Sequence, residues 1–274
     1  MTTAIIGTGG IGSAIARQLA SGGETLRLAS ADHESARTLA AEIGRAAVVA
    51  VDDRDALQGA GAVVLALRFS VLKGVIDQIA DQLADKLVVV PSNPLSTDAK
   101  GNLIRLLPQG QSSGKVVAGW LPAGARLAMA FGTMSAGLLE SSSNRSPEPA
   151  ALFYATDDDR AGEEVERLIR MAGFEPAKAG GLEQSGRLEV GGDLHDLVVG
   201  PAEARSLIGR ALCRKCHRTS HRRASSRADL RLLHRREEPL RVPHGRSGIR
   251  QFLDIGTGLS GSPEGGSRQR SRSG

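Results

Sequence analysis

The chain has 274 residues, 41% of them hydrophobic and only 3% aromatic, so its core must be aliphatic. No apolar run reaches the roughly 18 residues needed to span a bilayer, and the N-terminus lacks the pattern of a signal peptide, so we expect a cytoplasmic protein without a membrane partner. About 15 of the 35 Lys and Arg, but only about 5 of the 30 Asp and Glu, lie in residues 211–274. The remainder is therefore acidic despite the net charge of +5, which argues against nucleic acid as a partner of the folded part.

The first half of the chain alternates strand and helix patterns. We expect strands at 3–8, 25–30, 46–51, 62–67 and 86–92, and helices at 12–23, 32–44 and 71–85. Asp32 is placed to cap the second helix, and Gly44 to end it. The fourth and fifth strands are continuous apolar runs, as expected for a sheet covered on both faces. The pattern predicts a Rossmann-type, doubly wound α/β domain with a parallel sheet.

The second half is less regular. Residues 93–113 are rich in turn formers and read as a long loop, followed by strands at 127–135, 151–158 and 175–181 and helices at 160–174 and 201–212. We divide the chain into an NAD(P)-binding domain (1–145), a small C-terminal α/β lobe that completes the acceptor pocket (146–210) and a basic tail (211–274). The tail has the composition of a disordered appendage or of sequence read out of frame, and the alternative is an arm that binds RNA or a membrane.

The stretch "TAIIGTGGIGSAIARQLASGG" contains the motif G-x-G-x-x-G at Gly7, Gly9 and Gly12. In dinucleotide-binding proteins the first glycine permits a tight turn, the second admits the pyrophosphate and the third allows close packing of helix and strand. The first turn of the helix then offers unpaired N–H groups to the phosphates. Because the motif lies between a predicted strand and a predicted helix, it predicts a dinucleotide site.

The end of the second strand bears on which dinucleotide binds. An acid at this position usually holds the ribose 2′-hydroxyl of NAD, whereas this chain has Ser30 there, in "LRLASADHES". A serine does not repel a 2′-phosphate, and Arg37 lies one helical turn into the next segment. Asp32, however, follows two positions after the serine. These residues favour NADP and leave NAD as the alternative.

Several segments together resemble the family of NADP-dependent coenzyme F420 reductases. They are the glycine-loop segment, "VVVPSNPLSTDAKGN", "LPAGARLAMAFGTMSAGLLESSSNRSPEPAALFYATDD" and "GGLEQSGRLEVGGDLHDL", and the resemblance covers roughly residues 2–210. It implies hydride transfer between NADPH and a deazaflavin such as coenzyme F420, or another two-electron acceptor. It also implies a homodimer that acts on small molecules.

The resemblance assigns roles to particular residues. The pyrophosphate would be held by the loop of Thr8, Gly9, Gly10 and Ile11, and the 2′-phosphate by Ser30 and its neighbours. The nicotinamide would lie over the ends of the fourth and fifth strands, at Leu67, Arg68, Phe69, Pro91 and Asn93. The alternative for Asn93, which precedes a proline, is an Asx turn. Trp120 is expected in the core rather than in the wall of the ring pocket.

Two departures from the family pattern leave another reading open. Ala31 and Ser35 stand where the family has basic residues near the 2′-phosphate, and the stretch after "GDLH" is short. The alternative function is therefore an NADP-binding sensor or scaffold protein without turnover. An imine reductase of the pyrroline-carboxylate type shares the N-terminal pattern, but the long C-terminal dimerisation helices of that class are not evident.

Few other residues offer catalytic or metal chemistry. His195, flanked by Asp193 and Asp196, is a candidate for positioning or protonating the acceptor, and the alternative is a turn residue. Hydride transfer between two planar rings depends on alignment more than on an acid or base. The remaining set, Cys213, Cys216, His217 and His221, leaves almost no loop between ligand pairs, so we expect no zinc site. We likewise expect no disulfide in the folded part, which agrees with a reducing compartment.

Overall fold

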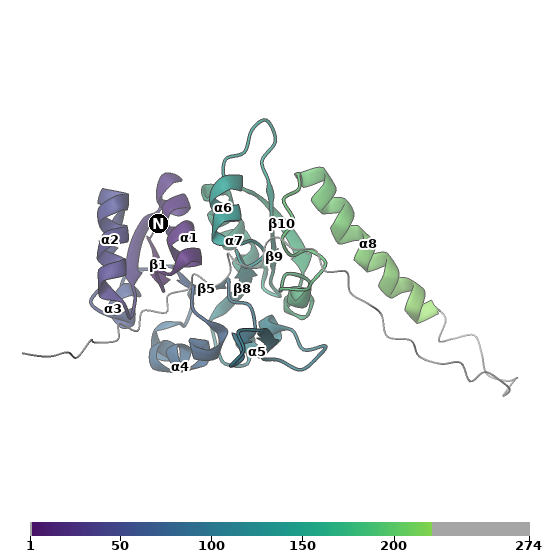
Figure 1. Cartoon of the computed structure of the whole chain (residues 1–274), viewed down its shortest axis with the longest axis horizontal. Helices are drawn as coiled ribbons and strands as arrows, with labels where there is room; N and C mark the ends of the chain where they lie inside the picture. The colour runs from purple at the N-terminus through teal and green to yellow at the C-terminus, as the bar shows by residue number, and fades with distance from the viewer. Residues whose placement is uncertain (1, 221–274) are drawn as a thin grey trace, which may run out of the picture.

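The structure is a computed structural model and describes residues 2–220 of the chain. Its centre is an eight-stranded sheet with the order β10-β9-β8-β5-β4-β1-β2-β3 (Figure 1). The strands are β1 (Thr2–Ile6), β2 (Thr25–Ala29), β3 (Ala47–Val49), β4 (Ala62–Leu65), β5 (Leu87–Val90), β8 (Arg126–Ala130), β9 (Ala151–Ala155) and β10 (Glu175–Gly180). Helices cover both faces, so the predicted Rossmann-type α/β fold is confirmed.

The described residues contain eight α-helices, of which α8 follows the last strand. They are α1 (Gly10–Ser21), α2 (His33–Ile43), α3 (Asp53–Ala56), α4 (Phe69–Ile79), α5 (Ser113–Ala118), α6 (Ala136–Ser142), α7 (Asp159–Met171) and α8 (Pro201–Ser220). Three short 3-10 turns accompany them: η1 (Gly44–Ala46), η2 (Ala80–Gln82) and η3 (Leu182–Arg187). The sequence pattern predicts α1, α2, α4, α7 and the start of α8, but not α3, α5 or α6, which are only 4, 6 and 7 residues long.

Side chains of the central strands alternate between two apolar cores, one on each face of the sheet. Ile6 and Leu65 belong to the first core and Ile5 and Val64 to the second, as the two-residue period of a strand requires. Figure 1 shows α4 and α5 on one side of the sheet and α1, α2 and α6 on the other. Burial on both faces explains the uninterrupted apolar runs of β4 and β5.

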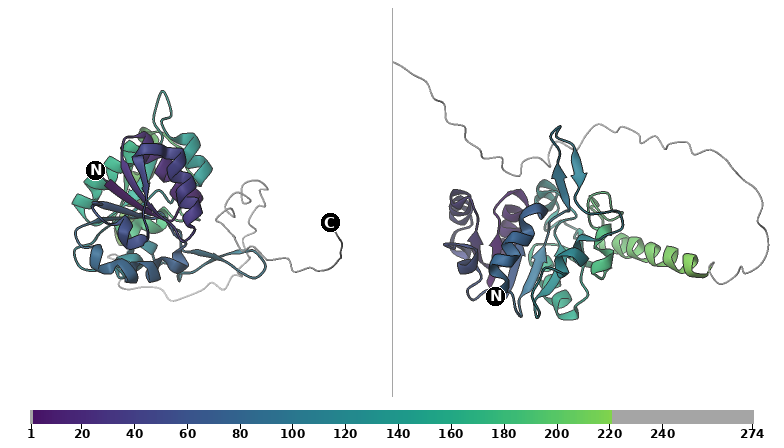
Figure 2. Two further views of the ribbon diagram at one scale, coloured as in Figure 1. Left: turned by 90° about the vertical axis from the view of Figure 1, so that its left-hand side faces the viewer. Right: turned by 90° about the horizontal axis from the view of Figure 1, so that it is seen from below.

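The structure corrects two expectations about the region after β5. The segment 93–113 is not a simple loop: β6 (Leu95–Thr97) and β7 (Leu103–Arg105) pair as an antiparallel hairpin. Figure 2 shows this hairpin projecting from the body of the molecule. The sheet is also not wholly parallel, because β9 runs antiparallel to β8 while β10 is parallel to β9.

Strands β9 and β10 of the predicted C-terminal lobe hydrogen-bond onto the edge of the same sheet. The division at residue 145 therefore stays a prediction. Helix α8 continues to Ser220, ten residues into the predicted tail, and the rest of the tail lies outside the described residues, as does His221. Within residues 2–220 no helix is both long and apolar enough to cross a membrane.

Candidate functional site

The glycine motif forms a tight loop between β1 and α1. Gly7 has a φ of +98°, and its N–H donates to the carbonyl of Ala29 at the end of β2, 2.8 Å away. A Cβ on Gly12 would lie 1.9 Å from the carbonyl oxygen of Gly7, so the first turn of α1 lies directly against the loop. The first and third glycines thus have the steric roles that the motif predicts.

The N-terminus of α1 has the features of a diphosphate site. Gly9 is its N-cap residue and supplies no side chain, whereas side chains of Asp32, Ser112 and Asp158 cap α2, α5 and α7. Gly9 and Gly10 are exposed. The N-cap residue therefore offers no side-chain acceptor to the first N–H groups of α1, at the end of a helix that favours negative charge. These residues fit the pyrophosphate of a dinucleotide.

This loop lies at the point where the order of the strands in the sheet reverses. β1 is bordered by β2 on one side and β4 on the other, so the crevice above β1 and β4 is a topological switch point. Gly10 faces α6 across this edge: a Cβ on Gly10 would lie 3.6 Å from Cβ of Ala136. The carboxyl ends of β1, β4, β5 and β8, all parallel, therefore form one edge at which a bound dinucleotide would lie.

The end of β2 lies beside the glycine loop. β2 ends at Ala29, and the hydroxyl oxygen of Ser30 accepts a hydrogen bond from the N–H of Asp32 at 3.3 Å. Ser35, in the first turn of α2, shares a hydrogen bond of 2.8 Å with the hydroxyl of Thr8. The side chain of Ser35 thus joins α2 to the loop. Ala31 is exposed, while Arg37 points to the surface and pairs with Glu34 at 3.5 Å.

The segments expected to hold the nicotinamide are adjacent. The hydroxyl of Ser92 donates to the carbonyl of Leu67 at 2.5 Å, which ties the end of β5 to the end of β4. Arg68 is exposed at the N-terminus of α4, but Phe69 is buried. The ring of Phe69 packs against Trp120, with centroids 5.4 Å apart, so both rings belong to the core rather than to the rim of the crevice.

Asn93 joins three segments. Its Nδ2 donates to the carbonyl of Gly132 at 2.9 Å, and its Oδ1 accepts from the N–H of Val190 at 2.8 Å. The Asx turn considered from the sequence is not formed, because the side-chain amide contacts distant loops. Gly132 lies so close to Pro91 that a Cβ on it would be 2.3 Å from the Pro91 carbonyl oxygen. The glycine in "AFGTMSA" is thus explained by this approach.

His195 lies under the loop that follows β8. Its side chain is only 5% exposed, and Nδ1 is 3.2 Å from the Asp196 carboxylate. Burial lowers the pKa of His195, and the neighbouring carboxylate opposes this only in part. The N–H of Asp196 donates to the carbonyl of Thr133 at 2.8 Å, so the segment "GDLHD" is fixed to the β8 loop.

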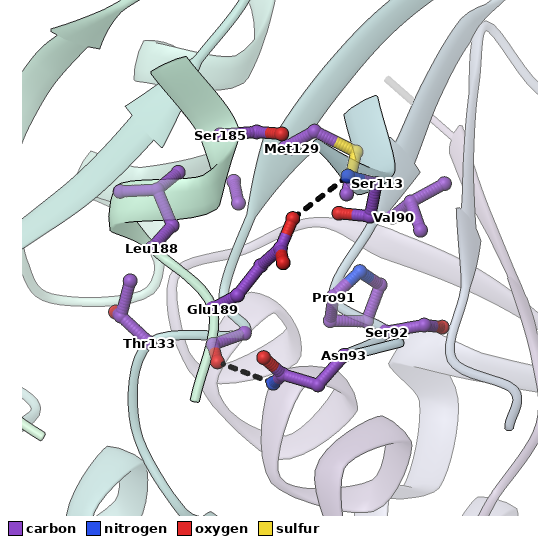
Figure 3. Close-up of a pocket in the computed structure, with 12 residues that line it drawn as sticks. Val90, Pro91, Ser92, Asn93, Ser113, Met129, Thr133, Ser185, Leu188 and Glu189 are labelled. Atoms are coloured by element: carbon purple, nitrogen blue, oxygen red, sulfur yellow. Dashed lines mark hydrogen bonds between the residues drawn. The ribbon is translucent and has the colours of Figure 1, made fainter. Parts of the chain in front are cut away.

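A small cavity with both polar and apolar lining residues lies between β5, β8, α5 and η3 (Figure 3). Its volume of about 20 Å³ admits a water molecule or one small polar group. The carboxylate of Glu189, 4% exposed, accepts from the N–H of Ser113 and pairs with Arg105 of β7, both at 2.7 Å. Among the described residues, the buried hydroxyls of Ser113 and Thr133 have no hydrogen-bond partner.

Sequence reasoning missed this cavity. Ser113 and Glu189 are 76 residues apart, and no local pattern connects them. The signals available were the glutamate in "RLEVGG" and the serine pair at the start of a short helix. Among the residues that the structure describes, no three His, Cys, Asp or Glu side chains are arranged to hold a metal ion.

Residues 2–94 match the model of a family described as NADP oxidoreductase, coenzyme F420-dependent. The predicted resemblance is confirmed over this segment, and the enzyme class predicted for the chain is that of the matched family. The match spans β1 to β5 and includes the glycine loop. No curated protein matches the sequence.

Solved structures extend the comparison to the second half of the chain. A hypothetical protein from Sinorhizobium meliloti is 28% identical, with a TM-score of 0.65 over 73% of this chain and 95% of its own. A protein from Arthrobacter sp., provisionally described as an F420-dependent NADP-reductase, is 22% identical, with a TM-score of 0.60 over 68% of this chain and 88% of its own. An imine reductase from Bacillus cereus is 20% identical, with a TM-score of 0.50 over 67% of this chain and 56% of its own. The last two support the fold alone.

Proposed function

We propose that the chain transfers a hydride between NADP(H) and a deazaflavin of the coenzyme F420 type. The main support is the uncapped, glycine-lined N-terminus of α1 at the switch point of the sheet, within the segment that matches the F420-dependent family. When bound, the nicotinamide supplies the hydride, and the deazaflavin accepts it as a two-electron ring.

The chain's own residues bind and align rather than exchange protons. The N–H groups at the start of α1 would hold the diphosphate. The hydrogen bond from Ser92 to Leu67 joins the ends of β5 and β4, where the nicotinamide would lie. Asn93 joins the segments of Gly132 and Val190 next to these strand ends. The segments that would face the acceptor are therefore restrained. Such alignment is the main requirement of ring-to-ring hydride transfer.

The test is a single substitution at Gly9. Its φ of −69° and ψ of −175° are open to any residue, so Gly9→Val is expected to fold. The valine side chain would project where the diphosphate lies. We expect NADPH affinity to fall by more than 10-fold, measured by calorimetry, with an unfolding midpoint close to that of the wild type.

Turnover is assayed with NADPH and a panel of deazaflavin, flavin, quinone and ferric acceptors. Oxidation with the deazaflavin alone supports the proposal in full. Tight NADPH binding without oxidation by any acceptor would instead favour a sensor or scaffold role. Unchanged NADPH affinity in Gly9→Val would overturn the assignment of the loop.

A further inference from the structure

The β6–β7 hairpin leaves the sheet at the edge where the dinucleotide would lie. β6 begins at Leu95, two residues after Asn93 and close to the carboxyl end of β5. The right-hand view of Figure 2 shows the hairpin extending on the side of the molecule opposite the start of β1, beyond the carboxyl ends of the parallel strands. A hairpin with three residues in each strand is marginally stable by itself, so its position depends on contacts with the rest of the protein.

An ion pair ties the base of the hairpin to the segment after η3. Arg105, the last residue of β7, lies opposite Leu95 in the register and pairs with the carboxylate of Glu189 at 2.7 Å. Glu189 is buried, and its other carboxylate oxygen accepts from the N–H of Ser113 (Figure 3). Arg105 also donates from Nη2 to the carbonyl of Gln111 at 2.7 Å. Because a buried carboxylate without its cation is strongly unfavourable, the ion pair holds β7 against this segment.

The same segment contacts the strand end where the nicotinamide would lie. Val190, the residue after Glu189, donates its N–H to Oδ1 of Asn93 at 2.8 Å. Asn93 in turn donates from Nδ2 to the carbonyl of Gly132 at 2.9 Å. Two consecutive residues therefore join the base of the hairpin to Asn93, and the hairpin borders the loops that would face the acceptor.

The two faces of β7 carry different side chains. Leu103 and Arg105 share one face and Ile104 lies on the other, because side chains alternate along a strand. Since Arg105 reaches the segment after η3, its face is turned toward the loops that would meet the acceptor. Leu103 lies about 7 Å farther along this face. Leu103 is 45% exposed and Ile104 is 44% exposed, so two apolar side chains of nearly equal exposure stand on opposite faces.

We propose that the face of β7 formed by Leu103 and Arg105 is the outer wall of the acceptor site. Leu103 contacts the apolar surface of a planar ring acceptor, which gains affinity from burial of both surfaces. Arg105 is a positioning residue that holds the hairpin in place through Glu189. This inference rests on the proposed function, because it requires an acceptor ring to lie over the nicotinamide.

The decisive variant is Leu103→Thr, and Ile104→Thr is its matched control. Threonine suits a strand and both side chains are exposed, so both variants are expected to fold. The KM for oxidised coenzyme F420 is measured with saturating NADPH on the full chain. We expect Leu103→Thr to raise this KM by about 5-fold or more while kcat stays within about 2-fold, as the loss of uniform binding predicts. Ile104→Thr should leave the KM within about 2-fold of the wild type.

Arg105→Gln tests the positioning role. Without the cation, the amides of residues 95–105 should exchange their hydrogens faster, measured by mass spectrometry, because the hairpin is no longer held. The KM for oxidised coenzyme F420 should rise, whereas NADPH affinity measured by calorimetry should stay the same. Arg105→Lys keeps a cation and should restore most of the affinity for the acceptor. If Arg105→Gln changes neither the exchange nor the KM, Arg105 does not position the hairpin.

The outcomes separate this inference from the proposed function. If the wild type binds NADPH but reduces no deazaflavin, both proposals are wrong. If the wild type reduces coenzyme F420 and the two threonine variants have equal KM values, only the assignment of the hairpin is overturned. If Leu103→Thr converts a dimer to monomers in analytical ultracentrifugation, the face contacts a second copy of the chain, and the assignment is likewise wrong.

Discussion

Gly12 offers a sharp test of how the nucleotide loop is built. Replacing it with alanine places a Cβ 1.9 Å from the Gly7 carbonyl oxygen and 3.0 Å from Cβ of Ala66, so the helix would have to move by more than 1 Å to reach ordinary contact. Overpacking of this kind costs about 1–3 kcal/mol or more, whereas alanine gains up to about 1 kcal/mol over glycine in a helix. Gly7 cannot yield easily, because it lies against the Ala66 carbonyl and has a positive φ.

We therefore expect Gly12→Ala to lower the free energy of unfolding by about 2 kcal/mol, which corresponds to a Tm decrease of about 4–8 °C in a protein of this size. Urea and thermal unfolding followed by far-UV circular dichroism measure both. Gly10→Ala is the control, since the added Cβ would meet only Ala136, at 3.6 Å. It should be neutral or slightly stabilising. A Gly12→Ala protein as stable as the wild type would refute the steric reasoning.

Two further predictions concern the acceptor side. Glu189→Ala leaves the buried N–H of Ser113 without its acceptor and should cost about 2–3 kcal/mol in urea unfolding, whereas Glu189→Gln keeps an acceptor oxygen and should cost about half as much. Equal losses of stability in the two variants would show that the ion pair with Arg105, rather than the hydrogen bond from Ser113, provides the stabilisation. Burial lowers the pKa of His195 below its ordinary value of 6.5. As the pH falls below 6.5, the histidine of the unfolded chain therefore takes up a proton before that of the folded chain, and the folded state loses stability. The free energy of unfolding should therefore decrease from pH 7 toward pH 5 more in the wild type than in His195→Gln. If it decreases equally in both proteins, the pKa of His195 is not lowered by folding.

The local features of the fold could be predicted from the sequence because their causes are local. Asp32 caps α2 by bonds to residues two and three positions away, and Asp158 caps α7 in the same way. The glycine loop is defined within six residues, and apolar runs mark the buried strands. The hairpin of β6 and β7 was not predicted, because each strand has only three residues. Their side chains are half-buried or exposed, so the sequence shows no alternation of apolar and polar residues.

The same distinction between local and long-range causes applies to the candidate site. The position of the nucleotide follows from the motif, but the roles of single residues depend on partners far along the chain. Phe69 begins α4 four residues after the end of β4, and its buried ring packs against Trp120 in the core. The amide of Asn93 reaches Val190, 97 residues away. No local pattern in the sequence encodes such a pairing, because the two residues meet only in the folded chain.

The distribution of these long-range hydrogen bonds also indicates which part of the site tolerates substitution. The dinucleotide half depends on Gly7, Gly9 and Gly12, whose steric roles leave little choice of residue. In the proposed function the acceptor would meet the loops after β5, β8 and η3. Asn93 joins these three loops, and Glu189 joins the segment after η3 to the start of α5. Substitutions in these loops can reshape the wall without disturbing the sheet, provided that the two joining side chains remain. The fold therefore fixes the donor more firmly than the acceptor, and the identity of the acceptor has to be established by turnover.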